Sequence, residues 1–292
     1  FGDHSDVMAC RQTGFAMLCE SNPQEVMDLG AVAHLAAIKG RVPFINFFDG
    51  FRTSHEIQKI AIWDNEDLAD MVDMDAVEAF RNPERPVMRG SHENGDIFFQ
   101  HREAANKYYD ALPEIVEEYM GKVNAKLGTN YQLFNYYGAP DADRVIIAMG
   151  SICDVAEEVI DYLNAHGEKV GLVKVRLYRP FRADKLLAAI PATATKIAVL
   201  DRTKEPGALG DPLYLDVVTA FANAGRQATI IGGRYGLGSK DTPPSNVFAV
   251  YEELTKSAPK RQFTVGIVDD VTHTSLEEKP SPNTAAPGTI EC

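Results

Sequence analysis

Cysteine is scarce in this sequence, and no two cysteines form a short motif. The four cysteines of the 292-residue chain lie far apart, at Cys10, Cys19, Cys153 and Cys292. The absence of a CxxC pair argues against a local zinc or iron–sulfur site, and so few thiols are typical of a protein kept reduced in the cytoplasm. We therefore expect free thiols that are buried as small apolar side chains, and no metal site.

Positive charge and long apolar runs are also scarce. The chain has 29 Lys and Arg against 42 Asp and Glu, which gives a formal net charge of -13. An acidic chain repels nucleic acid and anionic membrane surfaces, so neither is an expected partner. No apolar run approaches the roughly 20 residues needed to cross a bilayer. The seven histidines form no HExxH motif, and no nucleophile elbow is present.

What remains is the composition of a soluble globular protein. Hydrophobic residues make up 45% of the chain and charged residues 24%. The length suffices for two domains, each with its own core. The chain begins at Phe1 and stops shortly after "PGTIEC" without a closing element, so we expect a segment of a longer polypeptide.

The first clear element is a helix over residues 22–39. Asn22 can cap it, Glu25 has the spacing to reach back to the cap, and Gly40 ends it. The apolar run "VPFINFF" at 42–48 then predicts a buried strand. A helix after a turn, followed by a strand, indicates an α/β fold.

A second helix start is predicted after the strand. The Asp49-Gly50 pair indicates a turn, and Thr53 and Glu56 have capping-box spacing. The sequence thus predicts a strand, a turn and a capped helix in succession.

The rest of the chain is irregular at first and then regular. We expect helices over 64–80 and 102–126, separated by a polar loop, and a domain boundary over 127–140. After Asp143, strands alternate with helices, and Ser151 is predicted to cap the first of these helices. Such alternation predicts a parallel, doubly wound sheet.

The predicted fold class is α/β, with two domains built on mainly parallel, doubly wound sheets. We place the first domain at residues 1–137 and the second at 138–275. The tail, residues 276–292, is rich in Pro, Ser and Thr and is expected to be a linker.

Four polar loops follow predicted strands, where ligands bind in open parallel sheets. They are residues 3–6, 49–56, 201–212 and 232–244. The last contains "GGRYGLGSK", which fails as a P-loop because Ser239 and Lys240 are exchanged. The loop at 201–212 has the charges and glycines either of an anion site or of a self-paired interface loop, and both readings stay open.

Two histidines lie beside carboxylates. His4 lies between Asp3 and Asp6, and His55 precedes Glu56, so each is either a proton relay or an ordinary hydrogen-bonded histidine. Residue chemistry alone therefore predicts a soluble α/β protein whose function is undetermined.

Longer blocks of sequence carry a specific resemblance. "FGDHSDVMACRQTGFAML", "VPFINFFDGFRTSHEIQKI", "LYRPF", "LDRTKEPGALGDPLYLDV", "GRYGLGSK" and "FTVGIVDDVT" occur in this order up to about residue 275. Together they resemble the pyruvate:ferredoxin (flavodoxin) oxidoreductase family. The resemblance covers essentially the whole chain but only a minor part of the family's much longer polypeptide.

The resemblance implies an activity and its cofactors. The family oxidises pyruvate with thiamine diphosphate, Mg²⁺ and coenzyme A to acetyl-CoA and CO2, and passes electrons through [4Fe-4S] clusters to ferredoxin or flavodoxin. Residues 1–137 would be the later part of the pyrimidine-side thiamine domain, and residues 138–275 a transketolase C-terminal-like domain. The resemblance further implies a cytoplasmic homodimer.

The resemblance also limits what this chain holds. The family's catalytic, cofactor-binding and cluster residues match no position here, so the segment alone is expected to be inactive and to hold no cofactor. We expect Asp3, His4, Asp49 and Arg52 to line the substrate channel or to support the residues around it. The alternatives are an enzyme for another 2-oxo acid, an NADP-linked fusion, or a non-catalytic docking or dimerisation module.

Overall fold

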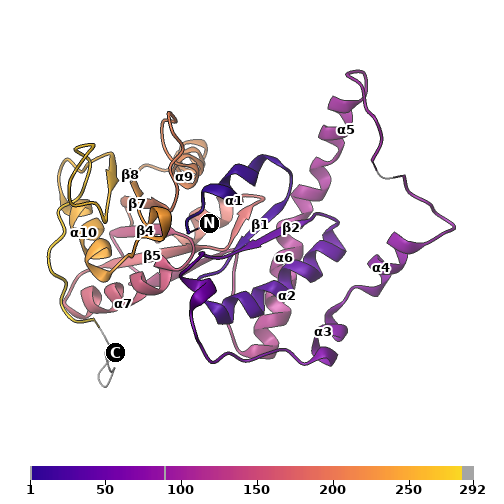
Figure 1. Cartoon of the computed structure of the whole chain (residues 1–292), viewed down its shortest axis with the longest axis horizontal. Helices are drawn as coiled ribbons and strands as arrows, with labels where there is room; N and C mark the ends of the chain where they lie inside the picture. Colours follow the sequence, from indigo (N-terminus) through magenta and orange to yellow (C-terminus); the bar gives the residue numbers. More distant parts are fainter. Residues whose placement is uncertain (1, 89, 285–292) are drawn as a thin grey trace.

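The computed structural model describes residues 2–88 and 90–284, and the chain forms two sheets flanked by helices (Figure 1). The thiol predicted at Cys292 and the last part of the predicted linker lie outside the described residues. Cys19 and Cys153 are free and buried, as predicted, whereas Cys10 is only half-buried.

The smaller sheet has the strand order β2-β1-β6. Strands β1 (Ala16–Cys19) and β2 (Phe44–Phe47) are parallel, and β6 (Leu177–Arg179) is antiparallel to β1. Helix α2 (Pro23–Gly40) connects β1 to β2 and packs against α6 (Asn106–Leu127).

The predicted cap of α2 is confirmed. The Asn22 side chain accepts a hydrogen bond from the backbone N–H of Glu25 at 3.0 Å. The Glu25 carboxylate reaches back to the backbone N–H of Ser21 at 2.8 Å. The helix extends through Gly40, and Arg41 rather than Gly40 adopts the left-handed conformation at its end, one residue later than predicted.

The helix predicted after Asp49-Gly50 is wrong. Thr53 begins only a single 3₁₀ turn, η2 (Thr53–His55), and its hydroxyl donates to the carbonyl of Ser21 at 3.0 Å instead of capping. The following segment is not helical. Its residue Ala61 is bound by the Gln24 side chain, whose Oε1 accepts from the Ala61 N–H at 2.8 Å and whose Nε2 donates to the Ala61 carbonyl at 3.2 Å.

The middle of the chain extends along one side of the molecule, beyond α2 and α6 (Figure 1). It contains the helices α3 (Asn65–Met71), α4 (Met74–Arg81) and α5 (Phe98–Ala104). The helix predicted over 64–80 is divided in two because Asp73 caps a new helix, accepting from the N–H of Ala76 at 2.9 Å. The helix predicted over 102–126 is found as α6.

The larger sheet has the strand order β3-β5-β4-β7-β8-β9. Its strands are β3 (Phe134–Gly138), β4 (Arg144–Ala148), β5 (Val170–Val175), β7 (Lys196–Asp201), β8 (Thr229–Arg234) and β9 (Gln262–Thr264). All neighbouring strands are parallel except β3, which is antiparallel to β5.

Helices cover both faces of this sheet. Helices α7 (Ile152–Ala165) and α10 (Pro244–Thr255) pack on one face, and α8 (Ala183–Ala189) and α9 (Pro212–Ala224) on the other. Successive side chains of β4 enter different cores, as the two-residue period of a strand requires. The predicted α/β class with a doubly wound sheet is therefore confirmed.

Two elements of the larger sheet differ from the prediction. The stretch expected to be a boundary, 127–140, contains β3. The single strand expected over "EKVGLVKVRLYRPF" is divided into β5 and β6, and β6 crosses to the smaller sheet. The division of the chain into domains at residue 137 stays a prediction.

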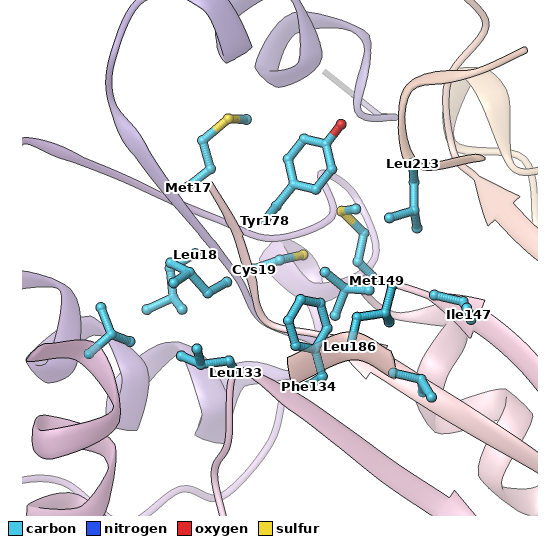
Figure 2. Packing of buried hydrophobic residues seen from close by; sticks show 14 of the residues in the cluster. Met17, Leu18, Cys19, Leu133, Phe134, Ile147, Met149, Tyr178, Leu186 and Leu213 are labelled. Carbon is cyan, nitrogen blue, oxygen red and sulfur yellow. The ribbon is translucent and has the colours of Figure 1, made fainter. Parts of the chain in front are cut away.

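One hydrophobic core joins the two sheets. Figure 2 shows Leu18 and Cys19 of β1 packed in one cluster with Phe134 of β3, Ile147 of β4 and Tyr178 of β6. These five side chains are buried. The shared core fixes how the loops of the two sheets face one another.

Candidate functional site

Polar residues from four separate segments meet where the two sheets face each other. Asp49 follows β2, Ser151 lies between β4 and α7, and Arg202 follows β7. His4 lies just before α1 (Ser5–Ala9). Unlike the other three residues, His4 follows no strand in the described part of the chain. We call these four residues the Asp49 cluster.

The Asp49 carboxylate is the centre of this cluster. Its Oδ2 accepts from the Ser151 N–H at 2.9 Å, from the Ser151 hydroxyl at 2.5 Å and from Arg202 Nη1 at 2.5 Å. Its Oδ1 is hydrogen-bonded to His4 Nε2. Gly150 permits the close approach, because a Cβ there would lie 2.7 Å from Asp49 Oδ1.

Burial and charge decide the ionisation of Asp49. The side chains of Asp49 and Arg202 are 0% and 1% exposed. Burial by itself raises the pKa of Asp49, but its contacts with His4 and Arg202 outweigh this effect and hold the pKa well below its usual value. The cluster is therefore a buried, hydrogen-bonded ion pair between the two sheets.

Asp3 and Arg52 form a more exposed layer next to the cluster. Asp3 Oδ2 accepts from the backbone N–H of Gly238 at 2.8 Å. Arg52 donates to the carbonyl of Ser239 at 3.1 Å and pairs with Asp241. Both residues thereby tie the first half of the chain to the loop at 232–244.

A cavity lies on either side of these residues. Asp3 and His4 line one of about 390 Å³. Arg52 and Arg202 line the other, of about 620 Å³. Asp49 lines neither cavity. The arrangement thus makes Asp49 a fixed internal partner, whereas Asp3 and Arg52 are open to a cavity.

The structure brings all four sequence-predicted candidates together, but it adds two residues that sequence reasoning missed. Ser151 was expected to cap α7; its hydroxyl instead donates to Asp49. The sequence places Arg202 only within a charged loop, with no sign of its partner. Arg202 directly follows β7, and Ser151 follows β4 by a few residues, at the same edge of the sheet. This shared position after parallel strands is the feature of the sequence that could have identified both residues.

The two remaining loops have simpler explanations. In 201–212, Glu205 pairs with Arg11 of the first half of the chain at 2.6 Å, and the N–H of Glu205 donates to Asp211 at 2.9 Å. The charges of this loop are therefore paired partly within the loop and partly with other segments. In 232–244, α10 begins only at Pro244, after left-handed Gly236, so no helix starts where a P-loop requires one. His55 is exposed and contacts the Ser54 hydroxyl.

A second buried acidic group lies behind the cluster. Arg176 binds the two oxygens of Glu25 at 2.6 and 2.9 Å. Glu20, at the end of β1, is 0% exposed, and neither of its oxygens has a hydrogen-bond partner among residues 2–88 and 90–284. Burial, with the nearby Glu25, raises the pKa of Glu20 well above its usual value. The fold therefore favours the neutral, protonated form of Glu20 over its charged form.

Within the described residues, no group of three or more His, Cys, Asp or Glu side chains could hold a metal ion. No helix of the described chain is both long and apolar enough to cross a bilayer.

Two family models match most of the chain. Residues 1–121 match "Pyruvate flavodoxin/ferredoxin oxidoreductase, thiamine diP-bdg". Residues 142–247 match "Pyruvate:ferredoxin oxidoreductase core domain II".

Curated relatives match over the full chain. The chain is 59% identical to a pyruvate:ferredoxin oxidoreductase of Moorella thermoacetica and 58% identical to a pyruvate-flavodoxin oxidoreductase of Enterobacter agglomerans. In both cases the match covers 100% of this chain and 25% of the relative. A probable pyruvate-flavodoxin oxidoreductase of Escherichia coli is 54% identical over 98% of this chain and 25% of its own length. The chain thus spans about a quarter of the length of these relatives.

A solved structure shares the fold. It is the 2-oxoglutarate:ferredoxin oxidoreductase from Magnetococcus marinus, with 2-oxoglutarate, coenzyme A and succinyl-CoA bound. It aligns with a TM-score of 0.51 and 18% identity over 82% of this chain and 42% of that one. At this identity the similarity concerns the fold alone.

Proposed function

Because the chain belongs to the pyruvate:ferredoxin/flavodoxin oxidoreductase family and spans about a quarter of its relatives, we propose that it forms part of such an enzyme. The enzyme would decarboxylate pyruvate with thiamine diphosphate and coenzyme A to acetyl-CoA and CO2. It would pass two electrons through [4Fe-4S] clusters to ferredoxin or flavodoxin. The observation that carries this proposal is the identity of 58–59% along the entire chain.

The side chains of the Asp49 cluster do not fit a thiamine diphosphate site. Asp49 already accepts four hydrogen bonds, and its carboxylate is 0% exposed, so it offers no oxygen to Mg²⁺ or to an aminopyrimidine ring. We therefore derive no catalytic step through these residues. We propose that this segment alone holds neither thiamine diphosphate with Mg²⁺ nor an iron–sulfur cluster, and that the rest of the whole protein is needed to complete those sites.

We propose that this chain holds the facing loops of its two sheets in a fixed arrangement beside the active site. His4 and Asp49 would act as supporting residues, because both are buried and bonded within the chain. Asp3 and Arg52 would lie at the edge of the substrate channel, because each lines a cavity. If Arg52→Ala in the whole enzyme left both kcat and the KM for pyruvate unchanged, the assignment of Arg52 to the channel would be wrong.

We further propose that the whole protein is a cytoplasmic homodimer. The few cysteines support a reducing compartment. The loop at 201–212 carries Leu209, which is 93% exposed, at a tip held rigid by the bond between Glu205 and Asp211. At a subunit interface the Leu209 side chain would be covered, and this is the role that we propose for the loop.

An anaerobic dye-reduction assay on the whole protein tests the proposed activity. Pyruvate, 2-oxoglutarate and 2-oxobutyrate are supplied in turn, each with and without coenzyme A. We expect dye reduction that requires pyruvate and coenzyme A together. Preference for another 2-oxo acid would correct the substrate. No reduction by protein shown to contain thiamine and iron would refute the proposed activity and favour a docking or dimerisation module.

A further inference from the structure

A separate cavity lies at the carboxyl ends of β8 and β9, on the larger sheet alone. It has a volume of about 310 Å³ and lies between the loop after β8 and the segment after β9. The backbone N–H of Val265 donates to the carbonyl of Arg234 at 3.1 Å, which joins the two sides of the cavity. This edge of a parallel sheet is where ligands bind in α/β folds.

The charge of the cavity is entirely positive. Lys204, Arg234 and Lys240 line it, and none of the described residues that line it is Asp or Glu. This stands out in a chain whose net charge is -13. In the described part of the chain, neither the Lys204 nor the Lys240 ammonium has a hydrogen-bonding or ion-pair partner, and Arg234 has one contact of 3.2 Å with Asp211.

The other walls of the cavity are mostly apolar. Leu237 comes from the loop after β8, and Val265, Ile267 and Val271 come from the segment after β9. The Lys240 stem lies along Gly266, since a Cβ at Gly266 would be 3.6 Å from Lys240 Cε. Asp270, near this wall, is already engaged, because it accepts from the N–H of Ser275 at 2.9 Å.

We propose that this cavity binds a small organic anion that has a short apolar body. Two free ammonium groups and one guanidinium would bind its carboxylate or phosphate, and the apolar wall would cover its hydrocarbon part. The volume lies near the lower end for ligand pockets, which favours a small ligand. The site goes beyond the proposed oxidoreductase activity, because none of its residues belongs to the Asp49 cluster.

Equilibrium binding to the full-length protein tests this proposal. The probes are acetate, propionate, butyrate and inorganic phosphate, each titrated at low and at high salt. We expect affinity to rise by up to about fourfold for each added methylene, because the apolar wall covers it. We expect phosphate to bind more weakly than butyrate, and all binding to weaken at high salt.

Variants assign the binding to this cavity. The double variant Lys204→Gln, Lys240→Gln removes two exposed positive charges and is expected to weaken butyrate binding at least tenfold. The matched control is Lys169→Gln, an exposed lysine that pairs with Asp141 and does not line the cavity, and it should leave the affinity within twofold. Val271→Asp should weaken butyrate binding further, and Val271→Leu should preserve it. Thermal unfolding of each variant checks that it is folded.

Three results would overturn the proposal. The first is no binding of any probe up to about 10 mM. The second is binding that the double variant and the control change equally, which would place the anion elsewhere. The third is equal affinity for acetate and butyrate, or tighter binding of phosphate, which would exclude a ligand with an apolar body. The readout is binding, so it does not depend on whether the protein oxidises pyruvate.

Discussion

Replacing Asp49 with Asn should destabilise the chain strongly although the side chain keeps its shape. The substitution leaves the Arg202 guanidinium, which is 1% exposed, without a counter-charge. Breaking a buried ion pair from one side costs about 3–5 kcal/mol, so we expect a loss of about 3 kcal/mol for this conservative change. For a chain of this size that corresponds to a fall in Tm of about 6 °C.

A double-mutant cycle with Arg202→Met identifies the cause. Arg202→Met alone leaves Asp49 without its charged partner, whereas the double variant leaves no lone charge in this pair. We therefore expect the double variant to be less destabilised than the sum of the singles by at least about 1.5 kcal/mol. Additive losses, or single variants within about 0.5 kcal/mol of the parent, would refute the assignment of a buried ion pair.

The lowered pKa of Asp49 also predicts that the stability of the chain depends on pH. The pKa of Asp49 is lower in the folded chain than the usual value of about 3.9. The ion pair therefore contributes stability above pH 4, and that contribution falls as the pH drops below 4 towards the folded pKa. Urea unfolding between about pH 3 and 6 should show this acid loss in the parent and a smaller loss in Asp49→Asn.

Three further predictions test other parts of the structure. Glu20→Gln should raise Tm, and the gain should grow as the pH rises above the usual glutamate pKa of about 4.3, because the raised pKa of Glu20 makes its ionisation in the unfolded chain oppose folding; a Tm difference that does not change with pH would contradict this. Gly150→Ala should cost about 2–3 kcal/mol, from a φ of 83° and a clash with Asp49, whereas Gly225→Ala, at φ 65° with no atom within 4 Å, should cost about 1 kcal/mol. Equal losses in urea unfolding would show that the clash is unimportant. Leu209→Asp should weaken subunit association in sedimentation experiments while the Tm at low concentration stays within about 1 °C, and an unchanged association constant would exclude the loop at 201–212 from the interface.

Local patterns predicted the regular half of the chain well. The continuous apolar runs at β4 and β7, and the helices α7, α9 and α10 that alternate with the strands, follow from periodicity alone. The failures have tertiary causes. Thr53 and Glu56 have the spacing of a capped helix, but contacts of Thr53 with Ser21, and of Gln24 with the following segment, replace the helix.

The candidate site could be predicted only in part. Sequence position placed Asp3, His4, Asp49 and Arg52 at the ligand edge of parallel strands, and the structure brings them together. Sequence position could not show that Asp49 is buried and fully hydrogen-bonded, because Arg202, the partner of Asp49, lies 153 residues away in the sequence. Ser151 was assigned to the nearest helix for the same reason: local spacing favours a cap, and only the folded chain supplies Asp49 as a competitor.

The position of β6 has a consequence for how the chain is made. Met17 of β1 is paired with Arg179 of β6, so the smaller sheet cannot be completed until residue 179 has left the ribosome. At about 5–20 residues per second, the roughly 160 residues between them take about 10–30 seconds to synthesise. Throughout that time one edge of β1 is unpaired, and an unpaired strand edge invites aggregation. The nascent chain should therefore depend on chaperones most while the segment between β2 and β6 is being translated.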